Sequence, residues 1–343
     1  MACYISTENE MKTILTGIKP TGMPHLGNLL GAIKPAIELS KTNNFDNSIY
    51  FIADYHALNA VRDPKQFKED VYGIAATWIA LGLDVDKSIF YKQSDVSEIF
   101  ELTWMLSCMT PKGDMNRAHS YKDKVQKNID AKKDQDQGVN MGLFNYPILM
   151  ASDILLYDTN VVPVGKDQVQ HIEIARSIAQ RINEHYGEGT LVEPKEKLQA
   201  GAGAYIVGLD GRKMSKSYDN SIGIWETEKK LKKLINKITT DSSDPDAPKD
   251  PDDSVIMDLY RLFATPEQIA QEEAKFRSGI GWGYAKADLF EVVNAYLSRP
   301  RKEYERLMND KGELDLILKN GAEKARQIAS VTMDRVRKSM TGF

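Results

Sequence analysis

Two lysines and two serines stand together in Lys213-Met214-Ser215-Lys216-Ser217, shortly after Gly211. A lysine ammonium is a compact charge on a flexible stem, and it suits phosphate oxygens. Because the two lysines are three residues apart in a polar stretch, they can follow the charge of a triphosphate as it breaks. The same composition is also common in solvated surface loops. The segment therefore indicates phosphate chemistry only if another part of the chain supplies a nucleotide site.

A second candidate nucleotide motif lies early in the chain, in Pro24-His25-Leu26-Gly27-Asn28. It falls between a strand-like run and a helical pattern, which is where α/β folds bind nucleotides. Gly27 lets a ribose or adenine ring approach the backbone, and His25 and Asn28 are short donors for phosphate oxygens. The alternative is an ordinary strand-turn-helix with a glycine at the helix start. Finding both motifs on one alternating chain favours the nucleotide interpretation.

A single carboxylate, Asp153, stands in the apolar helical stretch at 150–156. Burying a charge is costly unless the charge is paired or hydrogen-bonded. Asp153 therefore either caps a helix, pairs with a lysine, or accepts a hydrogen bond from a ligand. The residue types alone leave these alternatives open.

The elements that must position these residues alternate between strand and helix in the first half of the chain. We expect strands at 12–17, 48–53, 89–91 and 161–165, and helices at 26–40, 69–81 and 170–182, with a kink at Pro35. Such alternation predicts an α/β fold with a mainly parallel sheet and helices on both faces. Ligands bind such sheets outside the carboxyl ends of the strands, where the strand order reverses.

Past Tyr218 the strand signals stop, and helical patterns take over at 226–238 and 254–263. Thr265, Pro266 and Gln268 have the residue types of a capping box, which marks a further helix start. The loop at 241–253 is rich in Asp and Pro, and we expect it to be too polar to pack. The sequence predicts two domains, residues 1–222 and an all-α domain at 223–343.

The composition is that of a globular protein of 343 residues, with a formal net charge of −4 and two cysteines. The charge argues against a basic nucleic-acid coat, and the few cysteines argue against a disulfide framework. The histidines and cysteines show no zinc-site spacing. No apolar run reaches membrane-spanning length, and the polar N-terminus does not read as a signal peptide. We expect a cytoplasmic protein with no membrane partner.

Longer segments carry a specific family likeness. They are 17–22, 26–32, 146–157 and 162–171, together with 213–217, which matches the KMSKS motif in full. The residues 25–28 stand where the HIGH motif is found, with Asn28 in the last position. The chain resembles the class I aminoacyl-tRNA synthetases, and among them the tryptophanyl enzymes of bacterial type, from about residue 12 to the C-terminus. It departs from many relatives at Lys19 and Lys166, where Gln and Glu are common, and at Leu15, which replaces an aromatic residue.

The resemblance implies a Rossmann-like catalytic domain and a tryptophan–tRNA ligase reaction. The tryptophan carboxylate attacks the α-phosphorus of ATP, which enters with Mg²⁺, and the acyl group then passes to the terminal adenosine of tRNA(Trp). No protein-bound structural metal is expected. The implied catalytic residues, which stabilise the departing pyrophosphate, are Lys122, Lys213 and Lys216. The implied ATP-binding residues are Lys19, Pro20, Thr21, His25, Gly27, Asn28, Gly165, Lys166, Asp167, Ile206, Lys213, Met214, Ser215, Lys216 and Ser217.

For the amino acid, the resemblance implies that Asp153 accepts the indole N–H of tryptophan. The implied pocket around it consists of Gly17, His56, Tyr146, Met150, Val162, Val164 and Gln168. The helical domain would read the anticodon, with phosphate contacts among Lys229, Lys230, Lys232, Lys233, Lys237, Arg299, Arg301 and Lys302. A homodimer is also implied, with 102–116 and its Trp104 as the candidate interface.

Three rival functions remain open from the sequence. A tyrosyl enzyme would need two polar partners for the tyrosine hydroxyl, whereas the run at 162–168 follows the tryptophan pattern. A small-molecule nucleotidyltransferase would share the histidine motif but not the 213–217 loop or the long helical tail. A catalytically idle RNA-binding or tryptophan-binding regulator would give no pyrophosphate exchange, and intact Asp153, Lys213 and Lys216 argue against it.

Overall fold

The computed structural model describes residues 12–42, 44–165, 168–198 and 206–343. Its centre is a parallel sheet of five strands in the order β3-β2-β1-β4-β5. The strands are β1 Thr13–Ile18, β2 Asn47–Ile52, β3 Ile89–Lys92, β4 Val161–Val164 and β5 Lys195–Leu198. The four predicted strands are confirmed within one or two residues, and β5 was not predicted. Strand order reverses where β4 follows β1, so this is the sheet's switch point.

The sheet is parallel because both faces of its strands are apolar. In β2, Ile49 and Phe51 join the core on one face, and Tyr50 and Ile52 join the core on the other. Such a strand reads as a continuous apolar run, which is typical of a sheet covered on both sides. This is why β2 was recognisable from sequence.

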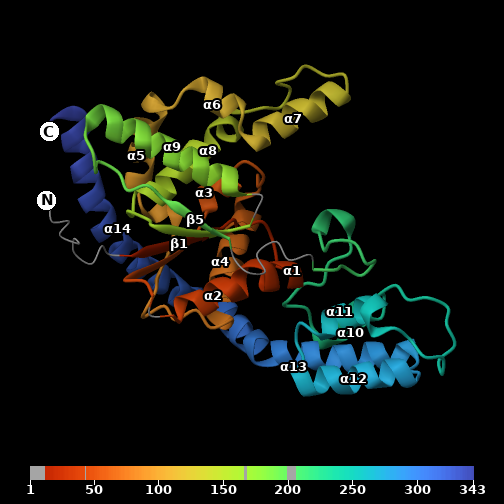
Figure 1. The fold of residues 1–343 in the computed structure, drawn as a ribbon. Helices are drawn as coiled ribbons and strands as arrows, with labels where there is room; N and C mark the ends of the chain where they lie inside the picture. The colour runs from red at the N-terminus through yellow and green to blue at the C-terminus, as the bar shows by residue number, and fades with distance from the viewer. Residues whose placement is uncertain (1–11, 43, 166–167, 199–205) are drawn as a thin grey trace, which may run out of the picture.

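Helices cover both faces of the sheet, as Figure 1 shows. The helices on one face are α5 Glu98–Met109, α8 Met141–Leu155 and α9 Val169–Tyr186, and those on the other are α2 Lys34–Ser40 and α4 Pro64–Ala80. The same half of the chain also forms the short helices α1 Leu26–Asn28, α3 Asp54–Ala57 and α6 Lys112–Asn116. Helix α7 His119–Asp130 projects from the body. Among the described residues, no helix combines the length and the apolar character needed to cross a membrane.

Two predicted helices differ from the prediction for local reasons, one in its internal geometry and one in its start. The predicted helix 26–40 has its expected extent, but residues Leu29–Ile33 form a π-helical segment between α1 and α2. Pro35 then stands in the first turn of α2, where its missing N–H costs little. The helix predicted at 69–81 begins earlier, at Pro64, because the Asp63 side chain caps it by accepting from Lys65 N at 2.8 Å.

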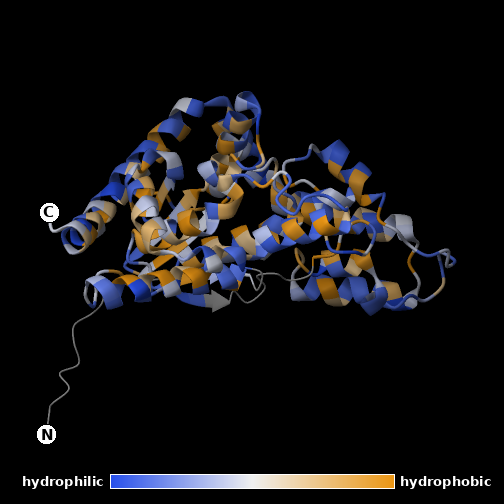
Figure 2. Cartoon of the chain, turned by 90° about the horizontal axis from the view of Figure 1, so that it is seen from above, coloured by the Kyte–Doolittle hydropathy of each residue, from blue (hydrophilic) through white to orange (hydrophobic). Residues whose placement is uncertain are grey.

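A helical lobe follows the 213–217 loop. Its helices are α10 Glu228–Ile235, α11 Val255–Tyr260, α12 Pro266–Ser278 and α13 Trp282–Asn309. The Thr265 capping box is confirmed. The prediction that 241–253 is too polar to pack is wrong in part: Lys249 is buried, and its Nζ donates to the carbonyls of Asp244, Pro245 and Ala247. Figure 2 shows hydrophobic residues gathered where the elements meet, with hydrophilic residues on outward sides.

The last helix, α14 Lys311–Thr341, leaves the lobe and returns to the sheet. Its residues Ala322, Ala325 and Ala329 join the core beside α5, and Leu314 and Leu318 join the core beside α4. Gly321 faces the backbone of Phe90 in β3 so closely that a Cβ atom there would fall well inside van der Waals contact with the carbonyl oxygen. The helices after residue 223 therefore belong to two bodies, so the predicted division at 222 stays a prediction.

Gly321→Ala is expected to destabilise the fold by about 1–3 kcal/mol, because the added methyl group must push α14 away from β3. The measurement is the thermal and urea midpoint of unfolding. Gly283→Ala in α13 is the matched control, since no atom lies within 4 Å of its added Cβ. Equal midpoints for the two variants would show that α14 does not depend on this close approach.

Candidate active site

A pocket of about 1020 Å³ opens at the carboxyl ends of β1 and β4, the switch point of the sheet. It brings together most of the residues predicted from the sequence. Those lining it are Gly17, Lys19, His25, Gly27, Asn28, His56, Tyr146, Met150, Asp153, Val162, Val164, Gly165, Gln168, Ile206, Lys213, Met214 and Ser215. Both motifs and the candidate amino-acid residues therefore share one cavity.

The remaining predicted residues are not among its lining. Lys166 and Asp167 lie outside the described residues. Pro20, Thr21, Lys122, Lys216 and Ser217 border the site without lining it. Lys216 is directed at the β1 loop instead, since its Nζ donates to the carbonyl oxygen of Thr21 at 2.8 Å.

Backbone pairing brings the two motifs together across the sequence. Leu26 N donates to Ile222 O at 2.9 Å, Ile224 N donates to Pro24 O at 3.1 Å, and His25 forms a bridge with Gly223. Because residues 222–224 follow the 213–217 loop by only a few positions, this pairing holds the end of the loop segment beside the start of α1. Main-chain hydrogen bonds of this kind carry no side-chain signature in the sequence.

Asn220, three residues after the 213–217 loop, holds the loop in shape through its side-chain amide. Its side chain accepts from Ser215 N at 2.8 Å and donates to Asp210 Oδ1 at 2.7 Å and to Lys213 O at 3.1 Å. Met214 N donates to Ile206 O at 2.8 Å, so these two buried apolar residues lie side by side at the pocket wall. The loop therefore has a defined shape with its lysines left at the surface of the site.

His25 is held as a neutral ring at the start of α1. Its backbone N–H donates to Asn28 Oδ1 at 3.1 Å, which orients the Asn28 amide. Burial lowers the pKa of His25 from 6.5 to about 4, and the charge of Lys216 acts in the same direction. At neutral pH His25 can therefore donate an N–H to a phosphate oxygen but does not carry a positive charge.

An NMR titration of the imidazole C–H signals should give His25 a midpoint near pH 4. Lys216→Met should raise this midpoint, because it removes the lysine charge that helps to lower the pKa of His25. Lys319→Met, at an exposed position of α14, should leave the midpoint unchanged. The unfolded chain binds this proton more readily, so the His25 contribution to stability is lost as the pH falls from 6.5 towards 4. A midpoint near 6.5 would contradict the buried, cation-facing position of the ring.

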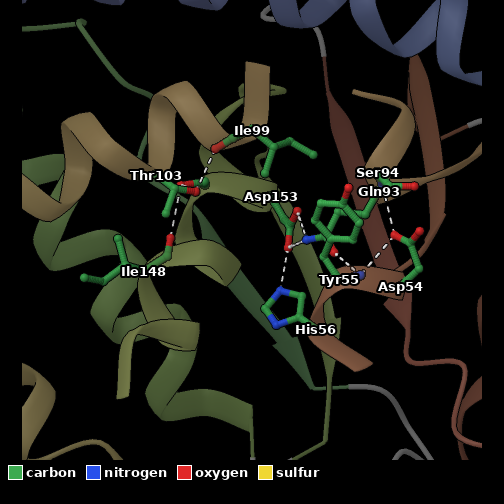
Figure 3. A network of polar contacts seen from close by, with 10 residues as sticks. Asp54, Tyr55, His56, Gln93, Ser94, Ile99, Thr103, Ile148 and Asp153 are labelled. Atoms are coloured by element: carbon green, nitrogen blue, oxygen red, sulfur yellow. Dashed lines mark hydrogen bonds and ion pairs between the residues drawn. The ribbon is translucent and has the colours of Figure 1, made fainter. Parts of the chain in front are cut away.

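Asp153 lies at the apolar end of the pocket and is 1% exposed. Figure 3 shows its carboxylate between His56 and Gln93. Gln93 Nε2 lies 2.8 Å from Oδ1 and 2.9 Å from Oδ2, and His56 Nε2 lies 2.9 Å from Oδ2. Neither predicted alternative, a helix cap or a lysine pair, describes these contacts.

The carboxylate of Asp153 is expensive to ionise in this position. Burial raises its pKa above the ordinary aspartate value, and the hydrogen bonds from His56 and Gln93 oppose that rise. A carboxylate has lone pairs for about four hydrogen bonds, and the three contacts from Gln93 and His56 leave room for another donor. The apolar walls of Met150, Val162 and Val164 make the site suited to a flat apolar ring with one N–H.

Tyr146 stands between the two halves of the pocket. Its hydroxyl lies 2.5 Å from Ser120 Oγ and 2.8 Å from His171 Nε2, and Lys19 Nζ lies 5.2 Å from the centre of its ring. Partial desolvation of its ammonium group lowers the pKa of Lys19, although the side chain as a whole is exposed. The Lys19 ammonium therefore lies against the Tyr146 ring at the wall of the pocket.

Several lining residues were not predicted: Thr16, Phe51, Asn59, His119, Ser120, Asp123, Leu143, His171 and Tyr218. Phe51 occupies the space that a side chain at Gly17 would need, and this explains the glycine. Ser120 and Asp123 arrive on α7, far from the strand ends in sequence. Of these residues, His171 stood within a segment singled out for its family likeness, and His119 and Ser120 precede the predicted Lys122.

Comparison with known proteins decides the family. The sequence matches the family model described as tRNA synthetases class I (W and Y) over residues 7–298. A tryptophan–tRNA ligase from Neisseria meningitidis is 45% identical over 327 residues, which cover 95% of this chain and 96% of that protein. The chain belongs to the bacterial tryptophanyl-tRNA synthetases. The family likeness expected from the two motifs is confirmed.

Further relatives agree with this assignment of the synthetase. The tryptophan–tRNA ligase of Pseudomonas syringae pv. tomato is 48% identical over 329 residues, covering 95% of this chain and 73% of that protein. A solved tryptophanyl-tRNA synthetase from Campylobacter jejuni, complexed with ADP and tryptophan, superposes with a TM-score of 0.88 at 42% identity. That match covers 96% of this chain and 100% of the other, so the predicted Rossmann-like fold with added helices is confirmed.

Proposed function

We propose that this synthetase activates L-tryptophan with ATP and transfers it to tRNA(Trp). In the first step a tryptophan carboxylate oxygen attacks the α-phosphorus, and the bond to the bridging oxygen breaks to release pyrophosphate. In the second step the 2′-hydroxyl of the terminal adenosine attacks the acyl carbon, and AMP leaves. The observation that carries the proposal is Asp153, a buried carboxylate in the same pocket as both nucleotide motifs.

The indole end of the pocket supports tryptophan over tyrosine. An acceptor-only carboxylate matches the single N–H of indole, whereas a phenol both donates and accepts. Tyr146 and Gln168 line the same pocket, and they are proposed to bind the α-amino group. Gly17 and His56 complete the amino-acid half of the same cavity.

The nucleotide end is proposed to work by positioning and charge neutralisation. His25 and Asn28 would donate to phosphate oxygens, Ile206 and Met214 would flank adenine, and the ribose would lie near Gly165. Lys213 and Lys216 would stabilise pyrophosphate as its charge develops, with Ser215 and Ser217 as donors. Pro20 and Thr21 lie next to Lys216, and Lys122 on α7 is kept as a third cation near the phosphates. Lys166 and Asp167 keep their proposed ATP contacts.

Mg²⁺ is proposed to enter as part of the nucleotide substrate. Within the described lining of the pocket, the carboxylates are Asp123 and Asp153, and Asp153 is already bound by Gln93 and His56. The described part of the chain also shows no group of three or more His, Cys, Asp or Glu side chains that could hold a metal ion. Phosphate oxygens, which Mg²⁺ prefers, would therefore supply most of its ligands.

The proposed macromolecular partners are tRNA(Trp) and a second copy of the chain, in the cytoplasm where tRNA is charged. Lys229, Lys230, Lys232, Lys233 and Lys237 are exposed on and after α10, as a phosphate-binding face requires. Arg301 is buried and donates a hydrogen bond to Asn294 Oδ1 at 3.0 Å, so we leave it out of the proposed phosphate contacts. Trp104 on α5 is 72% exposed, which supports the proposed dimer interface at 102–116.

The test is amino-acid-dependent ATP–pyrophosphate exchange with tryptophan, tyrosine and phenylalanine. Exchange with tryptophan alone is the expected result, because only indole offers a lone N–H to Asp153. Exchange with tyrosine would move the chain to the sister enzyme, and no exchange with any amino acid would indicate a binding protein without activity. Charging of tRNA(Trp) by the same preparation tests the second step.

A further inference from the structure

Gln93 lies directly behind Asp153 and has no place in the mechanism so far. It begins the short turn Gln93–Asp95 after β3, is 0% exposed, and does not line the pocket. Its Nε2 is within hydrogen-bond distance of both oxygens of Asp153, at 2.8 and 2.9 Å. A neutral amide that does not line the cavity thus contacts both oxygens of the carboxylate.

The orientation of the Gln93 amide is fixed by a backbone group. Its Oε1 accepts from Tyr55 N at 3.2 Å, so turning the amide around would set two donors against each other and two acceptors against each other. Tyr55 N also donates to Asp54 Oδ1 at 3.0 Å, and Ser94 N donates to the same oxygen at 3.0 Å (Figure 3). The backbone of α3 and of the β3 turn therefore dictates that Gln93 presents its NH₂ to Asp153.

The other groups around Asp153 make this donor important. His56 contacts Asp153 from α3. Tyr91 on β3 and Tyr157 after α8 are both buried, and the charge of Asp153 is one of the causes that raise the pKa of their hydroxyls. Asp54 is a second buried carboxylate on α3, next to Lys92 and the β3 turn. In the described structure the hydrogen bonds to Asp153 come from Gln93 and His56, so neutral or titratable donors, not a lysine or arginine, hold its charge.

We propose that Gln93 is a positioning residue for substrate specificity, which keeps Asp153 an acceptor and directs its remaining lone pair at the N–H of the substrate ring. The inference rests on the proposed function. His56 alone cannot keep Asp153 an acceptor, because a histidine ring nitrogen either donates or accepts a hydrogen bond. The NH₂ group of Gln93 only donates. A protonated Asp153 would instead present an O–H to the indole N–H, and the two donors would repel. Discrimination for an N–H therefore depends on Gln93.

The first test is Gln93→Met, which keeps length and volume but removes the donor, while Tyr55 N keeps Asp54 as a partner. Pyrophosphate exchange is measured from pH 5.5 to 8.5 with tryptophan and with 3-benzothienylalanine, in which sulfur replaces the N–H. We expect kcat/KM for tryptophan to fall about 10- to 100-fold, mostly through KM, the effect of losing one hydrogen bond to a charged group. The analogue should change less than about threefold, because it makes no such bond.

The pH profile separates this role from a structural one. In Gln93→Met the acid limb for tryptophan should move to higher pH, since a bond that lowers the pKa of Asp153 has been removed. Gln93→Glu should have the opposite pH dependence: its exchange activity with tryptophan should fall at alkaline pH. The introduced carboxyl group donates to Asp153 only while the two carboxyls share a proton. Gln180→Met, an exposed amide bonded to Glu193 at 2.8 Å, is the matched control and should change nothing.

An unchanged tryptophan-to-analogue ratio and unchanged pH limbs in both Gln93 variants would overturn the inference. Equal losses for both substrates would also overturn it, since they would indicate a general disturbance of the pocket. The wild-type protein keeps this outcome separate from failure of the proposed function, because wild-type exchange with tryptophan must be present before the variants are compared.

Discussion

Lys216→Ala is expected to lower kcat for tryptophan-dependent pyrophosphate exchange by about 100- to 1000-fold, the usual loss when one group that stabilises developing charge is removed. The KM for tryptophan should change less than about threefold. In the structure Lys216 Nζ is bound to Thr21 O and not to the pocket, so it contributes little to ground-state binding. Partial desolvation lowers the pKa of Lys216. We expect its ammonium to interact more strongly with the charge that develops on phosphate oxygens than with the neutral carbonyl.

The controls for this prediction separate charge from geometry. Lys216→Arg keeps the charge but not the compact ammonium, so it should restore only part of the rate. Lys319→Ala removes an exposed lysine from α14 and should leave exchange unchanged. If Lys216→Ala raises the KM for ATP while kcat stays constant, the lysine contributes uniform binding and the proposed role in pyrophosphate release is wrong.

The fold was predictable where a strand buried on both faces gives a continuous apolar run, or where capping residues mark the start of a helix. The strands β2 and β3 are apolar runs bounded by polar residues, and the Thr265 capping box marked the start of α12. The Asp63-Pro64 pair carried an equally readable start for α4 that the helical periodicity alone missed. Strand β5 is a four-residue strand rich in lysine and glutamate, and it forms only because β4 supplies a partner.

The return of α14 to the sheet was beyond the reach of local patterns. Its stripe of Gly321, Ala322, Ala325 and Ala329 predicts a helix with a narrow face but does not name the surface that this face meets. The surface is β3, some 230 positions earlier, and the Arg337–Glu101 ion pair at 2.6 Å joins segments just as distant. Such contacts are decided by three-dimensional complementarity, which no periodicity reveals.

The site residues also divide into those that were recognisable from the sequence and those that were not. The motifs at 25–28 and 213–217 were recognisable because phosphate chemistry restricts residue type and spacing within one short segment. Gln93 and Ser120 were not recognisable, because they are tied to the site by hydrogen bonds to residues distant in sequence, Asp153 and Tyr146. Lys216 is a third case: its role at the phosphates stays a prediction, and its partner in this structure is a backbone carbonyl.

Asp153→Asn is expected to lower kcat/KM for tryptophan by about 1000-fold or more, with no gain for tyrosine. The Asn oxygen can satisfy Gln93 and His56, which leaves its NH₂ facing the indole N–H, two donors in contact. Sites built to bond a substrate N–H or O–H lose several powers of ten when that bond cannot form. The measurement is pyrophosphate exchange with tryptophan, tyrosine and 3-benzothienylalanine, and the analogue should be the least affected substrate.

The stability of this variant should move in the opposite direction from its activity. Because burial raises the pKa of Asp153, the native state binds more protons than the unfolded state above pH 3.8, and the ionised carboxylate costs stability as the pH rises through the raised pKa. Asn removes that cost, so Asp153→Asn should unfold at the same or a higher temperature than wild type at pH 7 and should lose this advantage near pH 4. Asp63→Asn, a capping position where Asn serves equally well, should change neither activity nor stability. A variant that loses both together would show that Asp153 holds the fold, whereas activity lost from a more stable protein would show that the buried charge is kept for its ligand.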